Sequence, residues 1–64
     1  MKRIEIRSHR DGWFADFCHD EEIRKLFGAT ILPTPFTARA PIERVLAEIR
    51  RLNPGAAVSI GTPL

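Results

Sequence analysis

The sequence predicts a small α+β domain whose elements follow the order β-β-α-α-β. Three features support this fold class: an Asp-Gly pair between two alternating apolar stretches, two segments with apolar residues at helical spacing, and a short aliphatic stretch near the C-terminal end. We expect a three-stranded, mainly antiparallel sheet with one face covered by a short and a longer helix. Because 64 residues leave room for one small core, residues 1–64 are expected to form a single domain.

The first two strands are expected to form a hairpin around Asp11-Gly12, because Asp-Gly is a preferred pair for a two-residue hairpin loop. This register places Ile6 opposite Phe17 and Arg7 opposite Asp16. Apolar side chains then share one face of the hairpin, and charged side chains share the other. Arginines and an aromatic residue on the charged face suggest a nucleic-acid platform, but the acidic residues opposite the arginines favour cross-strand ion pairs.

Two helices follow the hairpin. The short helix is expected over 21–27, because Asp20 is a suitable N-cap and Gly28 a suitable C-terminal stop. The longer helix begins at Pro41 and ends before Asn53-Pro54-Gly55, since proline suits a first turn and cannot continue a helix. The apolar residues expected to face the core are Ile23, Leu26 and Phe27 in the first helix and Ile42, Val45, Leu46, Ile49 and Leu52 in the second.

The C-terminal part of the chain is expected to add one strand. Residues 56–60 form an aliphatic stretch in which Val58 and Ile60 alternate toward the core. The sequence leaves the position of this strand in the sheet open.

Residues 29–36 are expected to run extended over the surface without regular structure, because Pro33 and Pro35 forbid a helix and disfavour a central strand. This stiff segment carries large apolar side chains, and Trp13 offers a similar group on the hairpin. The candidate partner contacts are therefore Trp13, Ile31, Leu32 and Phe36. The alternative, which a domain this small favours, is that these side chains fold back as a lid on the core.

The formal net charge is +2, and charge of the two signs alternates in blocks along the chain. Charge alone is therefore weak evidence for a nucleic-acid partner. The candidate nucleic-acid contacts are the arginines on or just before the second helix: Arg39, Arg44, Arg50 and Arg51. The alternative is an ordinary solvated face, because Glu48 lies at pairing distance along the helix from Arg44 and Arg51.

Cys18 and His19 are adjacent in the sequence, and a cysteine beside a histidine suggests a catalytic thiolate pair or a set of metal ligands. On a strand, however, they point to opposite faces and cannot share a site. The sequence contains no Gly-rich phosphate loop, no HExxH and no paired CxxC. We therefore expect no enzyme activity, no cofactor and no metal. A lone cysteine suits a reducing compartment, which predicts a cytoplasmic location, and no stretch is apolar enough to predict a membrane span.

The hairpin segment Gly12-Trp13-Phe14-Ala15, followed by Thr37 and an amphipathic helix, is similar to the HicB-like antitoxin fold. The resemblance covers the hairpin and the second helix, and residues 37–41 depart from the way that helix starts in the family. The resemblance implies a nucleic-acid-binding regulator, and no functional residue of the family is assigned to a position in this chain.

Together these features predict a small non-enzymatic protein-interaction module, either self-associating as a homodimer or docking to a protein partner. The small core and the stiff apolar segment favour this function, because small domains gain stability from association. The alternative is a nucleic-acid-binding regulator of antitoxin type that uses the arginines of the second helix.

Overall fold

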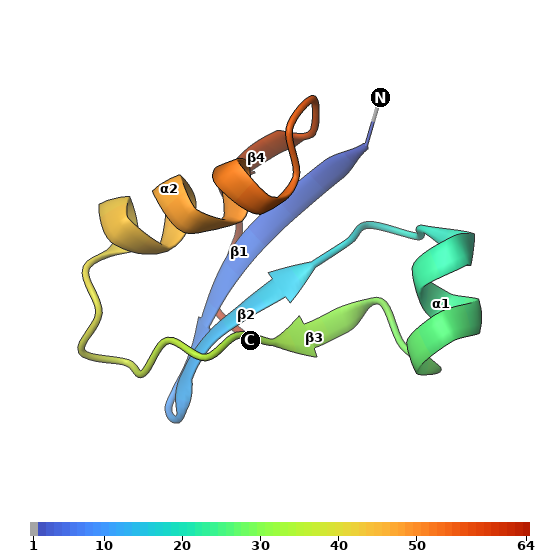
Figure 1. Ribbon diagram of the computed structural model, residues 1–64. Helices are drawn as coiled ribbons and strands as arrows, with labels where there is room; N and C mark the ends of the chain where they lie inside the picture. The colour runs from blue at the N-terminus through green and yellow to red at the C-terminus, as the bar shows by residue number, and fades with distance from the viewer. Residues whose placement is uncertain (1) are drawn as a thin grey trace.

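The computed structural model describes residues 2–64 and shows a small α+β domain, as the sequence predicts (Figure 1). In chain order its elements are β1 (Arg3–His9), β2 (Gly12–Asp16), α1 (Glu21–Phe27), β3 (Ile31–Pro33), α2 (Ile42–Leu52) and β4 (Ala57–Ile60). The strands form one mixed sheet in the order β3-β2-β1-β4, with two antiparallel pairs and one parallel pair. None of the helices formed by the described residues has the length and apolar character that a membrane span requires.

The expected three-stranded sheet is wrong by one strand, because part of the proline-containing segment joins the sheet as β3. Leu32 lies opposite Ala15 in an antiparallel ladder, and the Thr34 amide donates to the Trp13 carbonyl at 3.1 Å. Backbone groups alternate in direction along a strand, so those of Pro33 point away from β2. The missing N–H of Pro33 therefore lies at the outer edge of the sheet, where proline is tolerated.

The hairpin register is shifted by two residues from the predicted one. His9 lies opposite Gly12 and Ile6 opposite Ala15, so the loop consists of Arg10-Asp11. A shift of two residues keeps every side chain on its face, which is why the predicted division into an apolar and a charged face is correct.

The core lies between this apolar face and α2. In the part of the chain that the structure describes, six side chains are buried, and they come from β1, β2, α2 and β4: Ile4, Ile6, Ala15, Val45, Ile49 and Val58. The strand β4 lies parallel to β1, with Ile4 opposite Val58 and Ile6 opposite Ile60. Ile60, which was expected in the core, is 61% exposed because β4 is an edge strand with no neighbour on its outer side.

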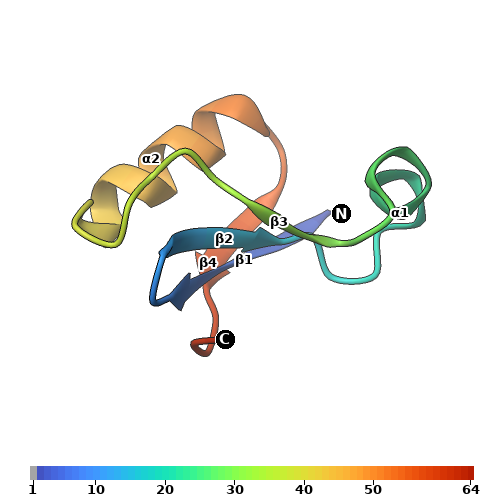
Figure 2. The same cartoon turned by 90° about the horizontal axis from the view of Figure 1, so that it is seen from below.

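The expectation that both helices cover the sheet holds for α2 and is wrong for α1. Both views place α1 beyond the end of β2 and β3, away from the layer formed by α2 (Figures 1 and 2). No residue of α1 is buried. The chain leaves the sheet through Cys18 and His19, which have φ angles of 50° and 64°. This left-handed turn redirects the backbone before α1 starts, so the apolar stripe of α1 does not reach the core.

Candidate functional site

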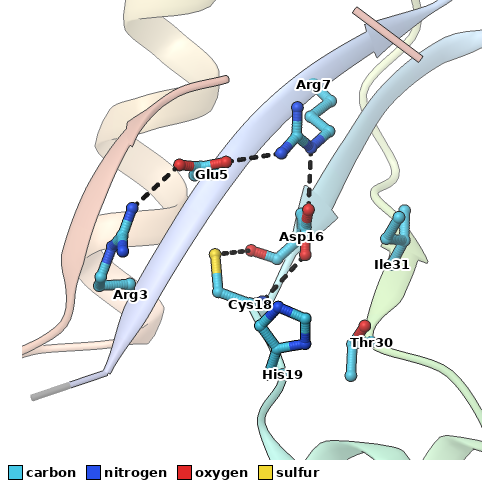
Figure 3. A pocket seen from close by; sticks show the side chains of 8 residues that line it. All are labelled: Arg3, Glu5, Arg7, Asp16, Cys18, His19, Thr30 and Ile31. Atoms are coloured by element: carbon cyan, nitrogen blue, oxygen red, sulfur yellow. Dashed lines mark hydrogen bonds and ion pairs between the residues drawn. The ribbon is translucent and has the colours of Figure 1, made fainter. Parts of the chain in front are cut away.

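The open face of the sheet carries a connected set of charged side chains (Figure 3). The Arg7 guanidinium donates to Glu5 at 2.6 Å and to Asp16 at 2.8 Å, and Arg3 donates to Glu5 at 3.2 Å. Arg7 also donates to the hydroxyl and the carbonyl of Thr62, which holds the C-terminal segment on this face. The Arg7–Asp16 pair is the cross-strand ion pair that the sequence predicts for this face. The predicted partner of Arg3, Asp20, instead pairs with Lys2, and Arg3 pairs with Glu5 on its own strand. Together these pairs leave little positive potential for a nucleic acid.

These ion pairs shift the proton affinity of their members. Burial acts to raise the pKa of Asp16, but hydrogen bonds from the Cys18 amide and from Arg7 outweigh it and leave this pKa below its ordinary value. The hydrogen bond to Asp16 raises the pKa of Arg7. Both groups are therefore ionised at neutral pH.

Cys18 and His19 line the same hollow of about 330 Å³ on this face, which corrects the prediction that they cannot share a site. The prediction assumed that both residues lie on a strand, whereas β2 ends at Asp16. In the left-handed turn, successive side chains do not alternate across a sheet.

The Cys18 thiol, together with the carboxylates of Glu5 and Asp16, offers three donor atoms within 4.8 Å of one another. Both carboxylates already accept hydrogen bonds from Arg7. Burial raises the pKa of the Cys18 thiol, and the negative charges of Asp16 and Glu5 raise it further. A protonated thiol is a weak nucleophile and a poor metal ligand, so the chemistry of this cluster favours a structural role.

Two of the four predicted partner contacts lie against the core. The Trp13 indole donates to the Ala40 carbonyl at 3.0 Å, and its backbone amide donates to the Phe36 carbonyl at 3.2 Å. The side chains of Trp13 and Phe36 are half-buried and pack on the core. These contacts favour the lid alternative for both residues.

The other two predicted contacts lie on opposite faces of β3. Leu32 is half-buried on the side of the buried Ala15, whereas Ile31 is 40% exposed and lines the hollow of the open face. The structure therefore does not bring the four predicted contacts together in one surface.

Two large exposed apolar side chains are neighbours in α1, which the sequence assigned to the core. Leu26 is 75% exposed and Phe27 is 61% exposed, and we call these two residues the α1 patch. Ile23, one turn before them, is half-buried. The helical spacing identified this stripe, but it does not show whether the stripe meets the core, because that depends on where the preceding turn sends the helix.

The four candidate nucleic-acid contacts differ in their partners. Arg51 donates two hydrogen bonds of 2.7 Å to Glu48, and Arg50 donates to the Val58 carbonyl at 3.1 Å. Arg39 and Arg44 line one hollow of about 460 Å³ at the start of α2, and neither forms an ion pair with any residue in 2–64.

No protein-family model matches the chain, and no curated protein or solved structure is significantly similar to it. The resemblance to HicB-like antitoxins stays a prediction from a short motif. Function is therefore inferred from the surfaces of the molecule itself.

Proposed function

We propose that this chain is a small non-enzymatic protein-interaction module that docks through the α1 patch. The observation that supports this function is the exposure of Leu26 and Phe27 on neighbouring positions of one helix. Isolated exposed apolar residues are common, but two large ones side by side on an otherwise amphipathic helix are typical of a contact surface. A cytoplasmic location, suggested by the single cysteine, belongs to the same proposal.

The charged cluster on the open face supports a non-enzymatic function. Its carboxylates are neutralised by Arg7, and the thiol of Cys18 has a raised pKa. A general base or nucleophile needs a proton affinity matched to its task and a free position facing the substrate. The groups in this hollow are instead engaged with one another.

A photo-crosslinking residue in place of Phe27 tests this function in cells that express the protein. The same residue in place of Glu43, an exposed position on α2, is the matched control. We expect a discrete adduct from position 27, none from position 43, and loss of the adduct when Leu26→Ser is added. The absence of any adduct from position 27 would contradict the proposal.

A second candidate function is nucleic-acid binding by a regulator of antitoxin type. The observation that favours it is the pair Arg39 and Arg44, which share one hollow with the aromatic ring of Phe36 and have no carboxylate partner among the described residues. Arginine side chains beside an aromatic ring are suited to phosphate contact and base stacking.

Fluorescence anisotropy with mixed DNA and RNA oligonucleotides tests this second function at low and moderate salt. Binding through phosphates weakens steeply with salt, because each neutralised phosphate releases counterions. We expect Arg39→Ala/Arg44→Ala to abolish such binding and Arg51→Ala, whose side chain is engaged by Glu48, to have a smaller effect. No binding at low salt excludes this function.

A further inference from the structure

We infer that the free edge of β4 pairs with β4 of a second copy of this chain, so that two sheets join into one through an antiparallel contact. This edge is separate from the α1 patch, and the inference goes beyond the proposed function. It is supported by the outward backbone groups of β4, by the residue types in that strand and by the way they match about a two-fold axis.

The backbone of β4 presents hydrogen-bonding groups on its outer side. The amides of Ala57 and Gly61 donate to carbonyls of β1 and of its N-terminal neighbour. Because backbone groups alternate in direction along a strand, those of Val58 and Ile60 point the other way, where the sheet has no further strand. A row of outward amides and carbonyls is complementary to the backbone of another extended strand.

The strand β4 lacks the features that usually keep edge strands apart. Natural edges are protected by proline, by charged side chains or by bulges. The other edge of the sheet has Pro33 in β3, whereas residues 57–61 contain neither a proline nor a charged residue. The side chain of Ile60 is 61% exposed on this strand. The edge of β4 is therefore suited to pairing with an uncharged strand, and β4 itself is such a strand.

Among residues 2–64, Arg50 is the side chain that hydrogen-bonds to these outward groups. Its guanidinium donates to the Val58 carbonyl at 3.1 Å. The helix α2 lies in a layer on one face of the sheet, so Arg50 reaches this carbonyl from that layer (Figure 2). A carbonyl oxygen has two lone pairs and can accept the amide of a second strand as well.

A two-fold axis perpendicular to the sheet makes the contact antiparallel and keeps both α2 helices on the same face. With this axis at Ser59, Val58 of one copy lies opposite Ile60 of the other. Each of these symmetry-related pairs exchanges both of its backbone hydrogen bonds, so the outward groups of both residues are used. The same strand serves both copies, which is the self-complementary arrangement that two-fold symmetry requires.

The side chains of β4 fit this register on both faces of the sheet. Val58 and Ile60 share the core face, because they are two residues apart, so the exposed Ile60 of one copy lies beside Val58 of the other. On the opposite face Ser59 meets its own copy at the axis, and Ala57 lies opposite Gly61. Only small uncharged groups meet there, so no like charges are brought together.

The expected dimer is weak. The four residues of β4 span about 13 Å, so the contact area falls at the low end of specific interfaces. We expect a dissociation constant in the upper micromolar range.

Ser59→Cys tests the register, in a Cys18→Ser background that removes the natural thiol. Residues that face each other in a non-hydrogen-bonded antiparallel pair have Cα atoms about 4.5 Å apart, within the range that a disulfide spans. We expect oxidised glutathione to yield a disulfide-linked dimer from position 59. Ala57→Cys in the same background is the matched control, because residue 57 is also exposed but lies about 13 Å along the strand from its own copy.

Ile60→Pro tests the hydrogen bonding by sedimentation equilibrium over a concentration series. This change removes an outward amide and keeps the amides that β4 donates to β1, and proline is tolerated on an edge strand. It should raise the dissociation constant at least about tenfold, because two hydrogen bonds are lost per dimer. Ile60→Thr shortens the same side chain but keeps the amide, and it should raise the constant only about threefold.

A chain that stays monomeric at millimolar concentration would overturn the pairing of β4. Equal disulfide formation at positions 57 and 59, or none at 59, would overturn it as well, and so would association that Ile60→Pro leaves unchanged. Far-ultraviolet circular dichroism checks the fold of each variant, and the two cysteine variants decide the question if Ile60→Pro unfolds. These results are independent of the crosslinker at position 27, which reports on the α1 patch.

Discussion

Gly12 lies where two segments distant in the sequence approach each other closely. A Cβ atom at this position would lie 2.6 Å from the Phe36 carbonyl oxygen, and the φ angle is +149°. The same carbonyl accepts the amide of Trp13, so the contact is part of the hydrogen bonding that holds the 34–40 segment on β2. The glycine that the sequence assigned to a hairpin turn is therefore required for a close approach between backbones.

Gly12→Ala is expected to lower the free energy of unfolding by about 2–3 kcal/mol, because it adds a backbone clash to a strained conformation. Gly28→Ala is the matched control: its φ is +77°, but nothing lies within 4 Å of the added Cβ. It should cost only about 1 kcal/mol. Urea denaturation measures both, and equal costs would contradict the role assigned to the Phe36 carbonyl.

Asp16 predicts a pH dependence of stability. Its pKa is lowered in the folded state, so the ionised carboxylate stabilises the fold above the unfolded pKa. This contribution is lost as the pH falls from about 4 through the folded pKa. Asp16→Asn should therefore cost about 1 kcal/mol at pH 6 and should flatten the acid limb of the stability curve.

Chemical denaturation between pH 6 and pH 2.5 measures this effect. Asp11→Asn is the control, because the Asp11 side chain is 80% exposed. If the Asp16 variant kept the full acid dependence, the pairing with Arg7 would not be what stabilises the ionised carboxylate.

At the scale of elements, the two apolar segments of the chain differ in how well their patterns predict their positions. The amphipathic α1 resembles a core-facing helix but is exposed, whereas Phe36 of the proline-containing segment lies on the core, as the lid alternative predicts. The left-handed turn at Cys18 and His19 accounts for the exposure of α1. Hydrogen bonds from Trp13 to Phe36 and Ala40 hold the 34–40 segment on the core.

Phe36→Ala and Phe27→Ala test these two positions with the same chemical change. Phe36→Ala should lower the free energy of unfolding by about 2 kcal/mol, roughly half the cost for a fully buried phenylalanine. Phe27→Ala should stay within about 0.5 kcal/mol in dilute solution, because its ring is exposed. Urea denaturation at low micromolar concentration measures both. A large loss in Phe27→Ala would mean that α1 packs on the domain.

At the scale of the whole molecule, the core consists of six buried side chains among the described residues 2–64. A domain of this size buries a smaller fraction of its surface on folding than a larger domain does, and its free energy of unfolding is correspondingly low. Any contact that covers the α1 patch therefore adds an appreciable share of the total free energy of unfolding.

The exposure of the α1 patch predicts that this patch contributes little to the thermal stability of the isolated protein. Leu26→Ser/Phe27→Ser should leave the melting temperature of a dilute sample within about 4 °C of that of the unmodified chain, since 1 kcal/mol corresponds to roughly 4–8 °C in a domain of this size. Differential scanning calorimetry measures the midpoint, and a larger fall would mean that α1 packs on the domain.

Much of the fold follows from signals that span only a few residues. The N-cap Asp20 accepts hydrogen bonds from the amides of Glu22 and Ile23, and Gly28 adopts the left-handed conformation that ends α1. The division of the hairpin into an apolar and a charged face is also local, because it depends on alternation alone. The sequence was therefore sufficient to predict the α+β class, both helices and the ion pairing of Arg7.

Other features depend on which distant segments compete successfully for the same surface. Pro33 argued against a strand, yet an edge position with its backbone pointing outward makes β3 acceptable. The parallel placement of β4, the loop at Arg10-Asp11 and the exposure of α1 likewise arise from long-range contacts. Local propensity determines what each segment can form, whereas the competition for the small apolar face of β1 and β2 determines what covers it. In this protein, α2 and the 34–40 segment cover that face, and the α1 patch stays uncovered.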